Sequence, residues 1–264
     1  MPVSLNEPRC KVVATHFAVS LFFATSLAIL VFRLWFPEGT HRLSGGLQLF
    51  WWIVFVDVVC GPLLTLVLYN PHKPKWERFS DLALVLLIQL AALGFGLNSL
   101  AQVRPLALVF EVDRFRVVST ADIVDADIGH LPGWFRPWSA TSIRTLGMRP
   151  LTSENEKWRS FEAALQGVEA GQRPWLWQDY EKSRPAVLAH ARPLADLQAA
   201  HPEKRMLIDS AIEAALSETL VREERDGQGL LWLPLVSRRS MEWVVLIDPL
   251  TLRIKAYVPL DGFK

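Results

Sequence analysis

Cysteine is scarce in this chain, and the positions of the two residues limit what they can support. Among 264 residues only Cys10 and Cys60 occur, so the sequence after residue 60 contains none. A disulfide framework in that part is excluded, because it would need several cysteine pairs. Residues 106–264 must therefore fold around a hydrophobic core of their own, and they are numerous enough to form one.

The short motifs of common enzyme families are also missing. The sequence has no Gly-x-Ser-x-Gly elbow, no His-Glu-x-x-His, no phosphate-binding loop and no Gly-x-Gly-x-x-Gly. We therefore predict no catalytic residues, no cofactor and no bound metal.

The chain also lacks an excess of positive charge. The chain has 28 Lys and Arg against 27 Asp and Glu, and the basic residues form no obvious patch. Nucleic acid is not an expected partner, since binding a phosphate backbone requires clustered positive charge.

Long apolar runs, in contrast, are prominent. Hydrophobic residues make up 51% of the chain, and the excess lies in residues 1–105. Three runs there are long enough to cross about 30 Å of hydrocarbon as helices: about 12–36, 47–69 and 82–103. A proline follows each run closely, as expected where a helix ends. The sequence predicts three transmembrane helices, the first of them an uncleaved signal anchor.

Lysine and arginine are unevenly distributed around these spans. Basic residues precede the first span or lie between the second and third: Arg9, Lys11, Lys73, Lys75 and Arg78. The loop between the first and second spans contributes Arg42 alone. By the positive-inside rule the N-terminus and the second loop are cytoplasmic. Because three spans are an odd number, residues 106–264 are predicted to lie on the other side of the membrane.

The exported part shows patterns of both strands and helices. Leu106–Ser119 is rich in β-branched and aromatic residues and alternates in its second half, which predicts a strand or hairpin. Leu131–Pro150 is rich in proline, glycine and tryptophan and is predicted to be irregular. Ser153–Glu156 matches a capping box, and one face of the following helix carries Trp158, Phe161 and Leu165.

The C-terminal part predicts a helix and a small sheet. Apolar residues at helical spacing favour a helix over Pro202–Leu220. Three strand-like runs follow, Leu230–Val236, Trp243–Ile247 and Leu252–Val258, and their short loops favour an antiparallel meander. The expected fold is a three-helix transmembrane anchor (1–105) followed by an exported α+β domain (106–264).

Asp57 lies near the middle of the second predicted span. A carboxylate at that depth costs about 2.5–3.5 kcal/mol on insertion scales, so it should face protein and find a partner. Gly61-Pro62 weakens the same helix, because proline removes a backbone donor. We expect Asp57 to pair with Gln89, Asn98 or Arg33. The candidate intramembrane contact residues are Asp57, Gly61, Pro62, Gln89 and Asn98.

Two interpretations of Asp57 stay open. It is either a satisfied structural group that joins three helices or a contact for a partner in the membrane. Other polar residues of the first span could also form hydrogen bonds between helices: His16, Thr25 and Ser26. One acid in three spans does not form a proton relay, so transport is not expected.

A cluster of acidic residues follows the first exported strand region. Asp122, Asp125, Asp127 and His130 could together bind a hard cation. A solvated turn with capping acids explains the same residues more simply, and this is the interpretation we favour.

Several segments in combination point to a family. They are Asp57 with Gly61-Pro62-Leu63-Leu64-Thr65, Asn70-Pro71-x-Lys73, and Gln102–Val118 with its Phe110-Glu111-Val112-Asp113-Arg114-Phe115. This combination resembles the TfpX/TfpZ family of type IV pilin accessory proteins. The resemblance covers the membrane part and the first exported strand well, and it continues more weakly through Val244–Pro249.

The resemblance implies an accessory protein of the bacterial inner membrane with a periplasmic C-terminal domain. Such a protein assists pilin handling and type IV pilus (fimbrium) assembly, with type IV pilin and the lipid bilayer as partners. We hypothesise that the spans hold the apolar pilin helix while Leu106–Ser119 contacts the pilin head. The candidate exported contact residues are Phe110, Glu111, Asp113, Arg114 and Phe115.

Two other functions remain as alternatives. A membrane-bound enzyme that modifies pilin or an envelope glycan would use the cluster from Asp122 to His130. A sensor would read a ligand with the exported domain, but the predicted cytoplasmic segments are too short for an output domain.

Overall fold

The computed structural model describes residues 7–36, 40–124, 131–135, 143–217 and 229–264. It divides the chain into two compact units, Met1–Arg104 and Pro105–Lys264.

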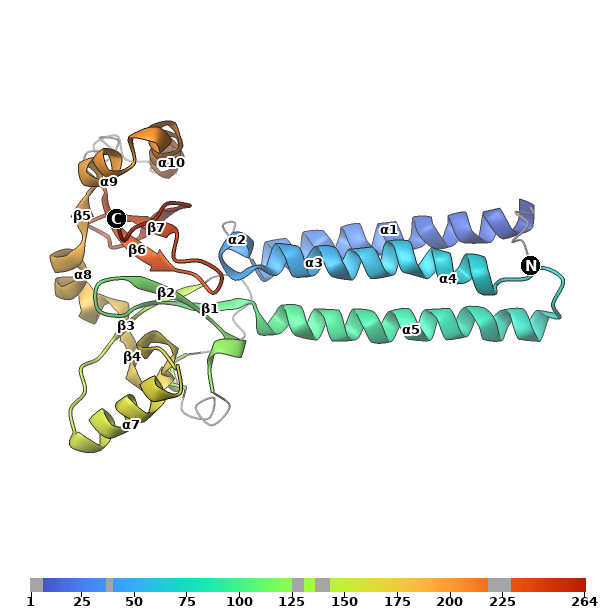
Figure 1. Cartoon of the computed structure of the whole chain (residues 1–264), viewed down its shortest axis with the longest axis horizontal. Coiled ribbons are helices and arrows are strands. Elements are labelled where there is room, and N and C mark those ends of the chain that lie inside the picture. The colour runs from blue at the N-terminus through green and yellow to red at the C-terminus, as the bar shows by residue number, and fades with distance from the viewer. Residues whose placement is uncertain (1–6, 37–39, 125–130, 136–142, 218–228) are drawn as a thin grey trace. The chain divides into compact units, whose positions relative to one another are not determined.

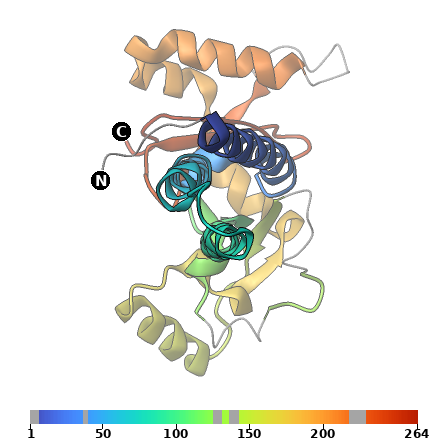
Figure 2. The same cartoon turned by 90° about the vertical axis from the view of Figure 1, so that its right-hand side faces the viewer.

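The first unit consists of helices that run side by side (Figures 1 and 2). They are α1 (Glu7–Leu34), α2 (His41–Ser44), α3 (Gly46–Phe55), the π-helical turn η2 (Val56–Cys60), α4 (Gly61–Leu68) and α5 (Lys75–Gln102). Within the described residues, three helical spans are long and apolar enough to cross a membrane: Pro8–Leu34, Gly46–Leu68 and Lys75–Gln102. The three apolar helices that the sequence predicts in this part of the chain are confirmed.

Packing and exposure in this unit both fit a membrane environment. A buried cluster of Val31, Phe36, Phe50, Ile53 and Leu100 joins α1, α3 and α5. Elsewhere large apolar side chains point outward, with Phe22 68% and Phe95 75% exposed. Such continuous exposed apolar surface is unfavourable in water and is normal against lipid.

The second unit is built on a mixed sheet. Among the described residues the strand order is β4-β3-β1-β2-β6-β7-β8, with β5 pairing β6. The strands are β1 (Pro105–Phe110), β2 (Phe115–Ser119), β3 (Arg144–Met148), β4 (Trp177–Asp179), β5 (Arg192–Pro193), β6 (Leu231–Val236), β7 (Trp243–Ile247) and β8 (Ile254–Val258). The β1–β2 hairpin and the antiparallel β6–β7–β8 meander are confirmed, and so is the α+β fold class.

One local prediction is wrong. Leu131–Pro150 was expected to be irregular, but Arg144–Met148 forms β3, which pairs in parallel with β1 and antiparallel with β4. Strand pairing outweighs the weak local preference, because strand stability depends mainly on neighbouring strands and burial.

Helices lie at both ends of this sheet and beside its middle (Figures 1 and 2). They are α7 (Glu154–Leu165), α8 (Arg184–His190), α9 (Leu194–Ala200) and α10 (Arg205–Ser217). Ile208 of α10 and Leu197 of α9 are buried against Trp232 and Leu246 of the sheet. The apolar face of α7 is different: Trp158 and Leu165 are 64% and 72% exposed and stay outside the core of the described residues.

The predicted capping box of α7 forms only in part. The Ser153 hydroxyl accepts a hydrogen bond from the Glu156 backbone N–H at 3.2 Å. The Glu156 carboxylate, however, accepts from the Thr152 N–H at 2.8 Å and from the Arg149 guanidinium at 2.6 Å. The helix start is therefore anchored to the preceding loop instead of to the Ser153 backbone.

Candidate functional site

A chain of hydrogen bonds links the three spans of the first unit. His16 of α1 lies with Nδ1 2.6 Å from the Thr65 hydroxyl of α4 and with Nε2 2.8 Å from Gln89 Oε1 of α5. The Gln89 amide nitrogen donates to the backbone carbonyl of Asp57 at 3.1 Å. One polar residue from each of three helices therefore converges on the π-helical turn.

The direction of these bonds follows from the Gln89 amide. Its nitrogen donates to Asp57, so its oxygen must be the acceptor for His16 Nε2–H. His16 Nδ1 then accepts from the Thr65 hydroxyl in the neutral imidazole, which has one donor and one acceptor nitrogen. The chain of bonds is thus complete without any charged member.

The Asp57 carbonyl needs this side-chain donor because the local backbone cannot supply one. In an α-helix it would accept from the Gly61 N–H, but that group is bonded to the Val56 carbonyl. In a continued π-helix it would accept from residue 62, which is proline and has no N–H. A carbonyl without a donor is costly in hydrocarbon, and Gln89 removes that cost.

Gly61 makes the approach of Gln89 possible. A Cβ atom on Gly61 would lie 2.0 Å from Gln89 Nε2 and 2.6 Å from its Cδ, far inside contact distance. Gly61, Pro62 and Gln89 therefore act together: proline removes the backbone donor, Gln89 replaces it, and glycine leaves room for the replacement.

The Asp57 carboxylate is not part of this hydrogen-bond chain. Its Oδ1 is buried and has no hydrogen-bond partner among the residues that the structure describes. The residue lines a cavity of about 440 Å³ between α1 and α5, with Ile53, Val54 and Asp57 as its floor. Buried polar groups in native proteins are almost always paired, so this free oxygen marks the cavity, which we call the groove, as the candidate functional site.

The groove has apolar walls and is accessible at its rim. Its walls come from α1 and α5: His16, Val19, Ser20, Phe23, Ala24, Leu27, Leu86, Gln89, Leu90 and Leu93. Rim residues are exposed, with Phe23 at 65% and Leu90 at 57%. The groove can therefore be reached from the outer surface of the first unit.

The expected partners of the Asp57 carboxylate are not found beside it in the described part of the chain. Gln89 bonds the Asp57 backbone carbonyl and not its carboxylate. Asn98 and Arg33 both lie outside the set of residues that line the groove. Thr25 and Ser26 bond back to the carbonyls of Leu21 and Phe22 in their own helix, so they do not link helices.

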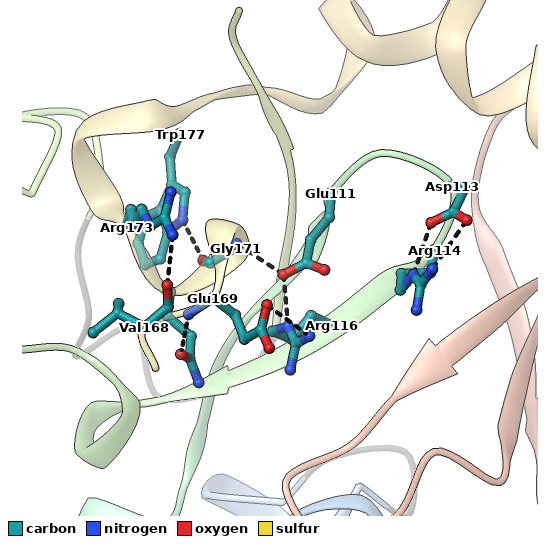
Figure 3. Close-up of polar contacts among 10 residues, drawn as sticks. Glu111, Asp113, Arg114, Arg116, Val168, Glu169, Gly171, Arg173 and Trp177 are labelled. Atoms are coloured by element: carbon teal, nitrogen blue, oxygen red, sulfur yellow. Dashed lines mark hydrogen bonds and ion pairs between the residues drawn. The ribbon is translucent and has the colours of Figure 1, made fainter. Parts of the chain in front are cut away.

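The candidate exported contacts are mostly internal. Phe110 and Phe115 are 1% and 0% exposed and pack with their ring centroids 5.5 Å apart. The buried Glu111 carboxylate accepts from Arg116 at 2.5 Å and from the Gly171 N–H at 2.8 Å (Figure 3). These three side chains are thus held inside the domain, because the hairpin directs them into its core.

The contacts around Glu111 have a structural role. Glu169 lies 3.7 Å from Arg116, and the Gly171 carbonyl accepts from the Trp177 indole at 2.8 Å. Arg173 donates to the Val168 carbonyl at 2.6 Å (Figure 3). The network fastens the segment before β4 onto the β1–β2 hairpin.

The turn of this hairpin is what remains at the surface. Asp113 and Arg114 form an ion pair at 2.7 Å, with side chains 47% and 32% exposed. The hydrogen bond from Arg114 holds the pKa of Asp113 below its ordinary value. Between them and Glu111, Val112 is 66% exposed.

The acidic cluster after β2 is only partly within the described residues. Asp122 accepts from the Ser119 backbone N–H at 2.8 Å and so caps the 3₁₀ turn Thr120–Asp122. Asp125, Asp127 and His130 lie outside the described residues. Within the described ranges no three His, Cys, Asp or Glu side chains come together as a metal site would require.

Two members of the site were not singled out by sequence reasoning. Thr65 appeared only within a longer motif, and His16 only as one of several polar residues of the first span. A usable signal did exist: His16, Asp57 and Gln89 each place a polar group in a different apolar span. The sequence does not specify how each helix is rotated about its axis, and this rotation determines whether such groups meet.

Comparisons with known proteins point to fimbrial assembly. The family described as fimbrial assembly protein FimB matches residues 6–45. A fimbrial assembly protein of serogroup I from Dichelobacter nodosus is 33% identical over 98% of this chain and 100% of its own length. The serogroup E1 protein is 34% identical over the same shares. The protein of serogroups C1 and C2 is 41% identical over 46% of this chain and 95% of its own length. No solved structure matches the chain.

Proposed function

Since the chain belongs to the fimbrial assembly protein family, we propose that it acts in type IV pilus assembly as a membrane-anchored accessory protein of the TfpX/TfpZ kind. In this role it binds the pilin before the pilin joins the fibre. The pilin helix lies against the spans, and the pilin head is contacted outside the membrane.

The groove is the observation that carries this proposal. A helix waiting in the bilayer needs a lateral binding surface, because lipid provides no hydrophobic driving force between helices. The groove supplies apolar walls for packing and a free acceptor, Asp57 Oδ1, for orientation. Neither feature is needed by an anchor that only tethers a domain.

The orientation we propose follows the distribution of basic residues. The N-terminus and the loop between α4 and α5 are cytoplasmic, and residues 106–264 are periplasmic in the bacterial inner membrane. A periplasm-active reporter fused after Gly133 is then active, and the same reporter fused after Lys75 is silent. The reverse result contradicts the proposed topology.

The exported contact we propose is the hairpin turn of β1 and β2. Asp113, Arg114 and Val112 remain accessible there, whereas Phe110, Glu111 and Phe115 support the turn from inside. We propose that the role is binding, and Asp122, one of the residues of the enzymatic alternative, caps a turn.

The proposal is tested with the intact protein and the major pilin of the same organism. The tagged protein, solubilised in mild detergent, should co-purify with pilin, whereas an unrelated three-span protein of similar abundance should not. Deletion of the gene should leave pilin in the membrane while surface fibres are lost. Normal piliation and pilin levels in the deletion strain would refute the proposed function.

A further inference from the structure

The groove is asymmetric along its length. His16, Asp57 and Gln89 lie at one end, and Leu27, Ile53 and Leu93 lie toward the other. On α1 the lining runs from His16 to Leu27, which is about 17 Å at about 1.5 Å per residue. The groove is thus about three helical turns long, with mainly apolar walls and with the polar residues His16, Asp57 and Gln89 at one end.

The end of the groove formed by His16, Asp57 and Gln89, which we call its polar end, contains one buried acceptor without a hydrogen-bond partner among the described residues. Both ring nitrogens of His16 are engaged, and Gln89 bonds through both its oxygen and its nitrogen. Asp57 Oδ1, in contrast, has no partner in the described part of the chain. An acyl chain can fill the space between the apolar walls but brings no hydrogen-bond donor to this oxygen.

The charges of the residues that line the groove indicate which kind of donor Asp57 would bind. Of the thirteen described residues that line the groove, Asp57 alone is a carboxylate, and none is lysine or arginine. A charge-assisted hydrogen bond is roughly twice as strong as a neutral one, and the attraction grows in a medium of low dielectric constant. A partner that fits the groove therefore has an apolar surface with a single positive charge positioned beside Asp57.

We propose that the groove receives one face of the pilin's apolar helix and that an ammonium group on that helix pairs with Asp57. This inference rests on the proposed function, because it takes the pilin as the occupant. A compact ammonium suits the single free acceptor better than a guanidinium, whose donors form a wide fork.

The chemistry is tested first with synthetic helices. Two 23-residue leucine–alanine peptides, one with lysine and one with methionine at the central position, are each reconstituted in lipid nanodiscs with the intact protein. A photo-crosslinking residue replaces Phe23 at the rim of the groove. The lysine peptide should crosslink at least about ten-fold more than the methionine peptide. Equal yields overturn the inference, and the comparison leaves Asp57 itself unchanged.

The variants then identify the partner group. Asp57→Asn keeps the size of the side chain and removes the charge, so the preference for lysine should disappear. Asp57→Glu should keep part of it. Asn98→Leu, which changes a residue of α5 outside the groove lining, serves as the control and should leave the preference unchanged.

Full-length pilin separates this inference from the proposed function. Capture of pilin by the wild-type protein and at least ten-fold weaker capture by Asp57→Asn supports both. Equal capture by the two proteins overturns the ammonium pairing and leaves the proposed function standing. Failure of the wild-type protein to capture pilin overturns the proposed function.

Discussion

Replacing Gln89 with leucine should open the π-helical turn at Asp57. The variant loses the bond to the Asp57 carbonyl and the bond from His16. A hydrogen bond between helices in a membrane contributes about 0.6 kcal/mol on average and up to about 1.7 kcal/mol. The loss of two bonds should therefore cost about 1–3 kcal/mol.

Hydrogen exchange on the intact protein in nanodiscs measures this cost locally. Peptides that cover Val56–Cys60 report the opening of η2, and opening free energy converts directly to exchange rate. A loss of about 1–3 kcal/mol corresponds to roughly 5-fold to 150-fold faster exchange. Asn98→Leu is the matched control, since it changes another amide of α5 that lies away from the groove, and it should leave the exchange of this turn unchanged.

A second substitution tests the reason for the effect. Pro62→Ala restores a backbone N–H beside the orphaned carbonyl, so Gln89 is no longer its only donor. The cost of Gln89→Leu should then be smaller in the Pro62→Ala background by about 0.6–1.7 kcal/mol, the value of one bond. The same cost in both backgrounds, within about 0.5 kcal/mol, would show that Gln89 does not act by capping the Asp57 carbonyl.

Three further predictions concern single side chains. Gly61→Val should accelerate exchange in η2 as much as Gln89→Leu does, because the Gln89 amide occupies the space; unchanged exchange contradicts the packing argument. Glu111→Ala should destabilise the exported domain by about 1.5–3 kcal/mol, because it removes the charged hydrogen bonds to Arg116 and to the Gly171 N–H and leaves Arg116 the longer 3.7 Å contact with Glu169. Arg114→Ala at the surface should cost under about 1 kcal/mol. Denaturant unfolding that ranks the two variants in the opposite order refutes this. Hydrogen bonding, first of all from Arg149, lowers the pKa of Glu156 from 4.5 to about 2. The ionised carboxylate therefore stabilises the folded state above pH 4.5, and this stabilisation is lost as the pH falls toward 2. Glu156→Gln should reduce the fall in melting temperature that acid causes, and an undiminished fall counts against this role of Glu156.

The exported hairpin shows what a local sequence pattern can and cannot predict. Alternation in the second half of Leu106–Ser119 predicted a strand or hairpin, and a hairpin forms, because strand periodicity is a local property. The same residues were proposed as a contact surface, yet Phe110 and Phe115 are buried. Burial depends on the strands beside the hairpin, β3 and β6, and no local pattern indicates which strands those are.

The α7 helix is the converse case. Its amphipathic pattern predicted a helix, and the helix forms. The apolar residues of its predicted face, Trp158, Phe161 and Leu165, are exposed. Periodicity thus indicated which residues share a face and not what covers it.

The sequence by itself determined the three spans and the strands of the C-terminal meander. A membrane helix satisfies its own backbone, so apolar length is enough to predict it, and short loops favour antiparallel neighbours. Only the tertiary structure decided that His16 and Gln89, 73 residues apart, would meet. It also decided that Gln89 would bond the Asp57 carbonyl and that the carboxylate Oδ1 would have no partner among the described residues. Helix rotation and packing determine these contacts, because each span could turn about its axis without changing its hydropathy.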